Sequence, residues 1–190
     1  MAKNKKLGIT DKELVNIKPI TENQKRVVEA WNSGKHLFLY GVAGTGKTFL
    51  SLHLALKEVL KASTEQQRVY IVRSLLPTRD IGFLPGDEED KSFLYQMPYQ
   101  NMVRFMFQAP TDNAFDRLYV DLRNQGTIEF LSTSFLRGIT IDNGIIIVDE
   151  CQNLNFHELD TIITRCGQNS RIIFCGDFQQ TDLNLSLIHI

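Results

Sequence analysis

The hydrophobic residues of this 190-residue chain form short apolar runs, separated by longer stretches in which they recur with helical spacing. The short runs are rich in Val, Ile, Leu and Phe and are bounded by glycine or polar residues, a pattern typical of buried strands. The predicted strands are residues 36–40, 68–73, 127–132, 145–148 and 171–175.

The longer stretches predict helices. Thr21 and Asn155 are good caps for the helices 22–33 and 155–165, and Gly126 and Gly167 are placed to end the helices 113–124 and 155–165. Strands that alternate with helices indicate an α/β fold, with a mostly parallel sheet and helices on both faces. The predicted helices are residues 22–33, 47–62, 88–108 with an interruption at Pro98, 113–124 and 155–165.

Composition limits the class of protein. A chain of this length with 43% hydrophobic residues makes one domain, and its net charge of −1 excludes a globally basic nucleic-acid coat. No apolar run is long enough to cross a membrane. We expect residues 1–20 to be a solvated tail, because no apolar signal core follows its lysines.

The cysteines indicate a reducing compartment. Cys151, Cys166 and Cys175 are odd in number and have neither disulfide-framework nor zinc spacing. Each has apolar neighbours and is expected to be a small buried residue. We therefore expect a cytoplasmic protein.

The strongest motif is a phosphate-binding loop between the first predicted strand and the helix that follows it. Residues 41–48 read Gly41, Val42, Ala43, Gly44, Thr45, Gly46, Lys47 and Thr48, which fits G-x-x-x-x-G-K-[ST]. Glycines let backbone N–H groups converge on phosphate oxygens, and the following helix presents its positive end. Lys47 supplies charge to the outer phosphates, and the Thr48 hydroxyl is a ligand for Mg²⁺.

Acidic and amide side chains follow two other strands. Asp149 and Glu150 end the run 145–148, at the strand end where open α/β sheets bind ligands. With the phosphate loop, they predict that Asp149 holds Mg²⁺ and that Glu150 is the general base for an attacking water. Gln179, after the strand 171–175, is placed to sense the γ-phosphate or orient that water, the alternative being a polar turn.

These motifs together resemble the PhoH family of P-loop ATPases. The family usually has alanine where Cys151 stands, and the resemblance covers about residues 20–184. The same core is similar to the first domain of superfamily-one helicases. The residues that carry the resemblance are 41–48, 82–87, 135–140, 149–153 and 176–183.

The resemblance implies a RecA-like sheet in which strand 171–175 lies between strands 36–40 and 145–148. It also implies ATP and Mg²⁺ as ligands, single-stranded RNA or DNA as a partner, a phosphate-starvation role and a homo-oligomeric ring. Gln24 matches the glutamine that reads adenine in helicase-like ATPases, with an exposed helix residue as the alternative. The domain is predicted over 21–184, and 185–190 does not match the family and looks truncated.

Two further sets of residues are weaker candidates. Arg73, Arg79, Arg137 and Arg165 could act on a neighbouring subunit's γ-phosphate, with Arg137 and Arg165 ranked first. Five aromatic residues could stack on bases, although their near-helical spacing favours packing in the core; they are Phe93, Tyr95, Tyr99, Phe105 and Phe107.

Other functions are less well supported by the residues. An ATP-binding switch without efficient turnover remains an alternative, but it would not need the acid Glu150. A nucleotide kinase would need an arginine-rich lid, and a GTPase an Asn-Lys-x-Asp guanine reader; the sequence has neither.

Overall fold

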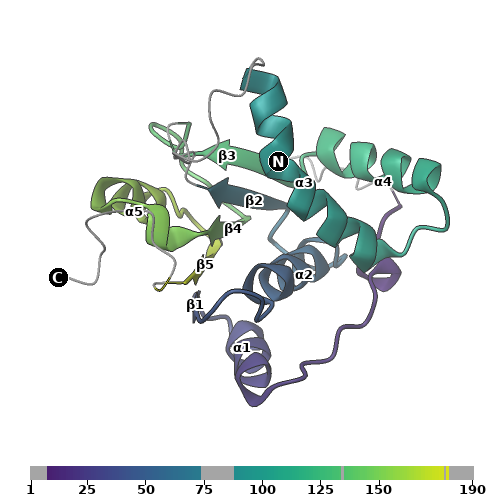
Figure 1. Cartoon of the computed structure of the whole chain (residues 1–190), viewed down its shortest axis with the longest axis horizontal. Coiled ribbons are helices and arrows are strands. Elements are labelled where there is room, and N and C mark those ends of the chain that lie inside the picture. Colours follow the sequence, from purple (N-terminus) through teal and green to yellow (C-terminus); the bar gives the residue numbers. More distant parts are fainter. Residues whose placement is uncertain (1–7, 74–87, 134, 178, 180–190) are drawn as a thin grey trace.

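The fold is built on a five-stranded parallel sheet (Figure 1). The computed structural model describes residues 8–73, 88–133, 135–177 and 179, and for 88–94 the backbone alone. The strand order is β1-β5-β4-β2-β3, so the expectation that β5 lies between β1 and β4 is confirmed. The strands are β1 (Leu37–Tyr40), β2 (Arg68–Arg73), β3 (Ile128–Ser132), β4 (Gly144–Asp149) and β5 (Arg171–Gly176).

The predicted helices all form, and two short 3₁₀ helices accompany them in the part of the chain that the structure describes. The expected interruption of α3 at Pro98 is wrong, because one helix runs through this residue. Proline removes one N–H and strains the turn before it, but the turns that follow are held in the larger core by Tyr99, Val103 and Met106. The elements are η1 (Asp11–Glu13), α1 (Glu22–Asn32), α2 (Lys47–Val59), α3 (Glu88–Phe107), α4 (Asp112–Asn124), η2 (Cys151–Asn153) and α5 (Phe156–Thr164).

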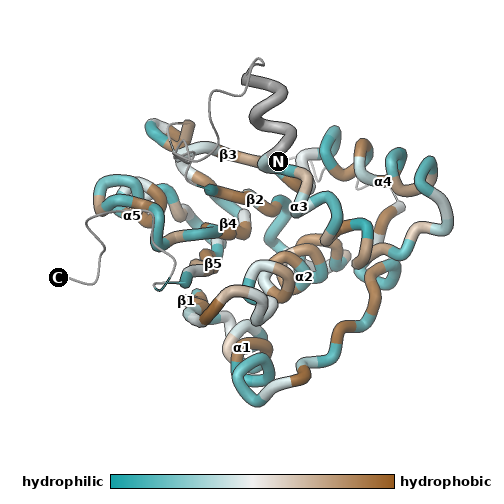
Figure 2. The backbone as a smooth tube through the Cα atoms, viewed as in Figure 1, coloured by the Kyte–Doolittle hydropathy of each residue, from teal (hydrophilic) through white to brown (hydrophobic). Residues whose placement is uncertain are grey.

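The sheet separates two apolar cores. Alternate residues of β4 point to opposite faces, so Ile145 and Ile147 join the core beneath α2, α3 and α4, whereas Ile146 and Val148 join the core beneath α5. All six residues of β4 are buried. Figure 2 shows brown, apolar strands inside the molecule and teal along much of α1. The predicted helices on both faces are thereby confirmed.

Part of the predicted N-terminal tail is packed. Leu14 is buried in the larger core, and Ile9 and Ile17 pack against it. The N–H of Val15 donates to the carbonyl of Met106 on α3 (2.8 Å), and the Val15 carbonyl lies 3.0 Å from Nε2 of His53 on α2. We call residues 9–17 the N-terminal strap, because they fasten α2 to α3.

His53 reaches the strap as a buried residue. Burial is the main cause that lowers the pKa of His53, so its ring is neutral at neutral pH and carries its proton on Nε2 to donate to the Val15 carbonyl.

Within the described ranges, no helix combines the length and apolar character needed to cross a bilayer.

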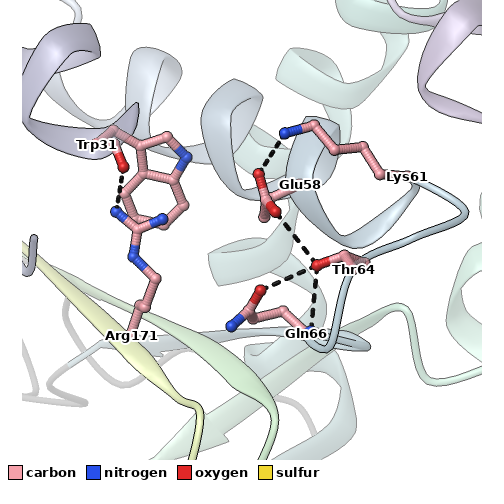
Figure 3. Close-up of polar contacts among 6 residues, drawn as sticks. All are labelled: Trp31, Glu58, Lys61, Thr64, Gln66 and Arg171. Atoms are coloured by element: carbon pink, nitrogen blue, oxygen red, sulfur yellow. Dashed lines mark hydrogen bonds and ion pairs between the residues drawn. The ribbon is translucent and has the colours of Figure 1, made fainter. Parts of the chain in front are cut away.

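An arginine at the start of β5 fastens α1 to the sheet (Figure 3). The Arg171 guanidinium lies 3.3 Å from the centre of the Trp31 ring, and its Nη2 donates to the carbonyls of Trp31 (2.7 Å) and Lys35 (2.8 Å). Figure 3 also shows a hydrogen-bond network in the loop that connects α2 to β2. In it, Thr64 Oγ1 lies 3.2 Å from Glu58 Oε1 and 2.9 Å from Gln66 Oε1.

We predict that Arg171→Met lowers the free energy of unfolding by about 2–4 kcal/mol, measured by urea denaturation. The methionine keeps apolar contact with Trp31 but loses two charge-assisted hydrogen bonds and the cation–π contact.

Arg68→Met is the matched control, since Arg68 also begins a strand but makes a partly exposed ion pair with Glu129. Such a pair contributes less than about 1 kcal/mol. Equal losses in the two variants would contradict the role given to Arg171.

Candidate active site

The loop between β1 and α2 is shaped by glycine. Gly44 and Gly46 have φ values of 75° and 82°, in the left-handed region that disfavours side chains. Thr45 Oγ1 donates to the Val42 carbonyl across the turn (2.9 Å). Gly46 is the N-cap of α2, which begins at Lys47 as predicted. The unpaired N–H groups of the first turn of α2 therefore face the loop that follows β1.

Lys47 is held over this loop. Its Nζ donates to the carbonyls of Gly41 (2.6 Å) and Val42 (2.9 Å). An ammonium has three donors, so these two bonds fix its position and leave a third for a bound anion.

The loop is joined directly to the acidic end of β4. Thr48 Oγ1 donates to Asp149 Oδ1 at 2.7 Å, although 101 residues separate them in sequence. Asp149 is only 7% exposed. Asp149 therefore lies beside the Lys47–Thr48 turn, as the predicted Mg²⁺-holding roles of Thr48 and Asp149 require.

A second hydroxyl holds the other oxygen of the same carboxylate. Tyr99 on α3 is 2% exposed, and its hydroxyl donates to Asp149 Oδ2 at 2.6 Å. Burial, and then the negative charge of Asp149, raise the pKa of Tyr99 far above its usual value. The phenol therefore stays protonated and remains a donor.

Glu150 adopts a backbone conformation that is costly for its residue type. Its φ of 51° and ψ of 42° are left-handed, which is uncommon outside glycine and is found at functional sites. The side-chain amide of Gln152 donates to Glu150 Oε2 (2.5 Å), and its oxygen accepts from the N–H of Asp177 (3.0 Å). Gln152 thus connects the ends of β4 and β5.

The phosphate loop and the ends of β4 and β5 line one small cavity of about 220 Å³. This volume suits the phosphate end of a nucleotide, since sites that enclose whole ligands are about 300–1,000 Å³. A larger cleft of about 980 Å³ lies near the opposite ends of β2 and β3 and contains none of the predicted site residues. The small cavity is lined by Ala43, Gly44, Gly46, Lys47, Thr48, Phe49, Met102, Asp149, Glu150, Cys175, Gly176 and Asp177.

The residues present fit Mg²⁺. Thr48 and Asp149 offer hard oxygen atoms beside the phosphate cavity. Mg²⁺ takes one or two protein ligands and completes its shell with water and phosphate oxygens. No cluster of three or more His, Cys, Asp or Glu residues suited to a metal occurs in the described ranges.

Two predicted glutamines lie near the site, and their roles stay predictions. Gln24 Oε1 accepts from the N–H of Ile20 (2.8 Å) in a capping arrangement, and its Nε2 is 3.4 Å from the Thr45 carbonyl, so it lies against the phosphate loop. Gln179 is exposed, and its N–H donates to the Asp177 carboxylate (3.0 Å).

The other candidates are spread over the fold. Arg137 is exposed, and Arg165 follows α5 half-buried. Arg73 ends β2 beside Asp149 in register, with its guanidinium 5.9 Å from the centre of the Tyr95 ring. Arg79, residues 82–87 and the Phe93 side chain lie outside the described residues.

The expectations for the aromatic residues and the cysteines are met in part, and Tyr95 is half-buried. Tyr99 and Phe107 are buried, as the core alternative requires, whereas Phe105 is exposed and packs edge-on against Phe49. All three cysteines are free; Cys151 and Cys175 are buried, and Cys166 is only half-buried.

Sequence reasoning missed three residues of this site. Gln152 and Asp177 both lie in motifs that carry the family resemblance, at 149–153 and 176–183. Each is a polar residue close behind a strand end, and that position is the signal from which they could have been predicted. Tyr99 gave no comparable signal, because its contact with Asp149 depends on how α3 packs.

Comparison with known proteins agrees with the geometry. The model of the family described as PhoH-like protein matches residues 16–188. The chain belongs to the PhoH-like protein family. This is a family of P-loop ATPases.

Three PhoH-like relatives illustrate the extent of the match. The chain is 32% identical to Protein PhoH2 of Bacillus subtilis over 94% of its own length and 40% of the relative's. It is 34% identical to a PhoH-like protein of Synechocystis over 90% of its own length and 49% of the relative's. It is 32% identical to Protein PhoH of Escherichia coli over 85% of its own length and 44% of the relative's. The chain therefore spans less than half the length of each of these relatives.

We predict that Gly176→Ala lowers the free energy of unfolding by about 1–3 kcal/mol, because an added methyl overpacks the end of β5. A Cβ at Gly176 would lie 2.7 Å from Cys151 Sγ and 3.3 Å from Gln152 Oε1. Removing the sulfur with Cys151→Ala should recover part of this loss in a double-mutant cycle.

The matched control is Cys166→Ala, which removes a half-buried sulfur that is not among the closest neighbours of Gly176. Its effect should simply add to that of Gly176→Ala. Additive effects for Cys151→Ala as well would show that the sulfur is not the group that Gly176 accommodates.

Proposed function

We propose that this chain binds ATP and hydrolyses it with Mg²⁺. The observation that carries the proposal is the 2.7 Å hydrogen bond from Thr48 to Asp149, which joins a phosphate loop to a buried acid. Glu150 follows that acid directly and lines the same small cavity. A binding loop, a metal-binding pair and a general base are the parts that ATP hydrolysis needs.

On this proposal the loop holds the phosphates. The N–H groups of residues 43–48, the positive end of α2 and the Lys47 ammonium bind phosphate oxygens. Thr48 and Asp149 would hold Mg²⁺, which when bound offsets the negative charge that develops on the phosphates. The Thr48 proton already points at Asp149, so its oxygen lone pairs are free to face the cation.

Glu150 would accept the proton of the attacking water. The Gln152 amide donates to one of its oxygens and so restricts the carboxylate's orientation. Gln179 would contact the γ-phosphate or that water, and Gln24 the adenine. The alternative, an ATP-binding regulatory module with little turnover, predicts that Glu150 has no role in rate.

We predict that Lys47→Ala abolishes nucleotide binding, whereas Glu150→Gln keeps binding and slows turnover by about 10²–10⁴-fold. Lys47 supplies charge to the bound ground state, while a general base acts only in the transition state. Binding of a fluorescent ATP analogue and release of phosphate measure the two effects.

Glu65→Gln is the control, because Glu65 is exposed and lines the far cleft. It should leave binding and turnover unchanged. Equal loss of ATP affinity in the Lys47 and Glu150 variants would refute the separate roles, and unchanged turnover in Glu150→Gln would favour the regulatory module.

We further propose single-stranded RNA or DNA as a partner, a phosphate-starvation role and a cytoplasmic location, with no membrane partner. The support is the family membership, together with Arg73 at the sheet edge that carries the site. Phosphate release with and without single-stranded RNA, with single-stranded DNA and duplex for comparison, tests the coupling. Unchanged turnover would remove the nucleic-acid proposal and leave the ATPase standing.

We also propose a homo-oligomeric ring in which a neighbour's arginine completes the site. If Arg137 is that group, Arg137→Ala should bind ATP normally and hydrolyse it about 10³-fold more slowly. Mixing it with Lys47→Ala should restore some phosphate release, because each variant supplies the part that the other lacks. Monomeric protein with turnover per subunit that does not depend on concentration would contradict the ring.

A further inference from the structure

Three residues of α3, spaced three apart, face the end of β4, the phosphate cavity and the first turn of α2 in turn. Tyr99 reaches Asp149, Met102 lines the phosphate cavity, and Phe105 packs on Phe49 with ring centres 5.6 Å apart. Residues three apart on a helix are neighbours on its surface. This face of α3 therefore lies against Phe49, the residue that follows Thr48.

The Tyr99 hydroxyl has one well-defined direction. Its ring is almost fully buried and packs edge-on against Phe130 of β3, with centres 5.5 Å apart. Packing that fixes the ring also fixes the phenolic oxygen, which lies in the ring plane. The hydroxyl can therefore hold Asp149 in place rather than follow its movements.

Asp149 needs such support because the terminal torsion of an aspartate is soft. Thr48 binds one carboxylate oxygen and Tyr99 the other, and two bonds on opposite oxygens fix the plane of the group. A carboxylate has about four acceptor positions, so two remain for water molecules around a cation.

We propose that Tyr99 is a positioning residue of the Mg²⁺ site, holding the Asp149 carboxylate in the orientation that metal binding with the nucleotide requires. This inference rests on the proposed ATP and Mg²⁺ function. Outer-shell partners of metal ligands typically contribute 10–100-fold to metal affinity or activity.

Tyr99→Phe tests the proposal, since it removes one oxygen and keeps the ring. Binding of a fluorescent ADP analogue should be unchanged without Mg²⁺, and the gain in affinity that Mg²⁺ gives should fall about tenfold. The Mg²⁺ concentration for half-maximal phosphate release should rise by a similar factor. A purely structural role would lower the melting temperature and leave the Mg²⁺ response unchanged.

Tyr119→Phe is the matched control. The Tyr119 hydroxyl is also buried, and its ring stacks on Phe115, but the structure gives its oxygen no hydrogen-bond partner within the described residues. Removing it should leave the Mg²⁺ response at the wild-type value. A shift equal to that of Tyr99→Phe would overturn the proposal.

A second measurement does not require the Tyr99→Phe variant to be stable. Fluorotyrosine incorporation gives five ¹⁹F signals, of which four are assigned by Tyr→Phe changes at Tyr40, Tyr70, Tyr95 and Tyr119. The remaining Tyr99 signal should shift more on adding Mg²⁺ with ADP than on adding ADP alone. A Tyr99 signal indifferent to Mg²⁺ would overturn the inference.

The outcomes also separate the inference from the proposed function. If wild-type protein binds no nucleotide, or Mg²⁺ does not strengthen binding, the proposed function fails. If wild-type protein depends on Mg²⁺ and Tyr99→Phe follows the same Mg²⁺ curve, the function stands and the role of Tyr99 fails.

Discussion

The carboxylate of Asp149 is the point on which the site depends. It ends a strand that is buried on both faces and paired on both edges, so its position is set by the whole sheet. A buried charge is costly unless it accepts hydrogen bonds. Thr48 from α2 and Tyr99 from α3 supply these bonds, and both helices are thereby placed relative to β4.

Much of this arrangement could be predicted from local sequence. The phosphate loop, the acids after β4 and the order of the central strands follow from short patterns, because a parallel sheet brings the carboxyl ends of its strands to one edge. The bond between Thr48 and Asp149 is a consequence of that topology and needs no further information.

The rest depends on contacts between elements that local patterns do not encode. Tyr99 lies in an aromatic helix, where spacing indicates a core residue but not which polar group its hydroxyl meets. Pro98 is a strong local signal for a break, yet α3 continues because its packing outweighs one lost backbone bond. The strap has no helical or strand periodicity, and its apolar residues Ile9, Leu14 and Ile17 find partners only in the assembled fold.

The strap also affects how firmly α2 and α3 are held at the end of the sheet that carries the candidate site. Val15 is bonded to His53 on α2 and to Met106 on α3, the two helices whose hydroxyls meet at Asp149. The pair of helices is therefore tied at two separate places, once through a carboxylate and once through a single backbone residue. Two separate ties keep the helices from moving apart. The spacing of the two hydroxyl donors is therefore partly determined by residues 9–17, which lie before the phosphate loop at residues 41–48 in the sequence.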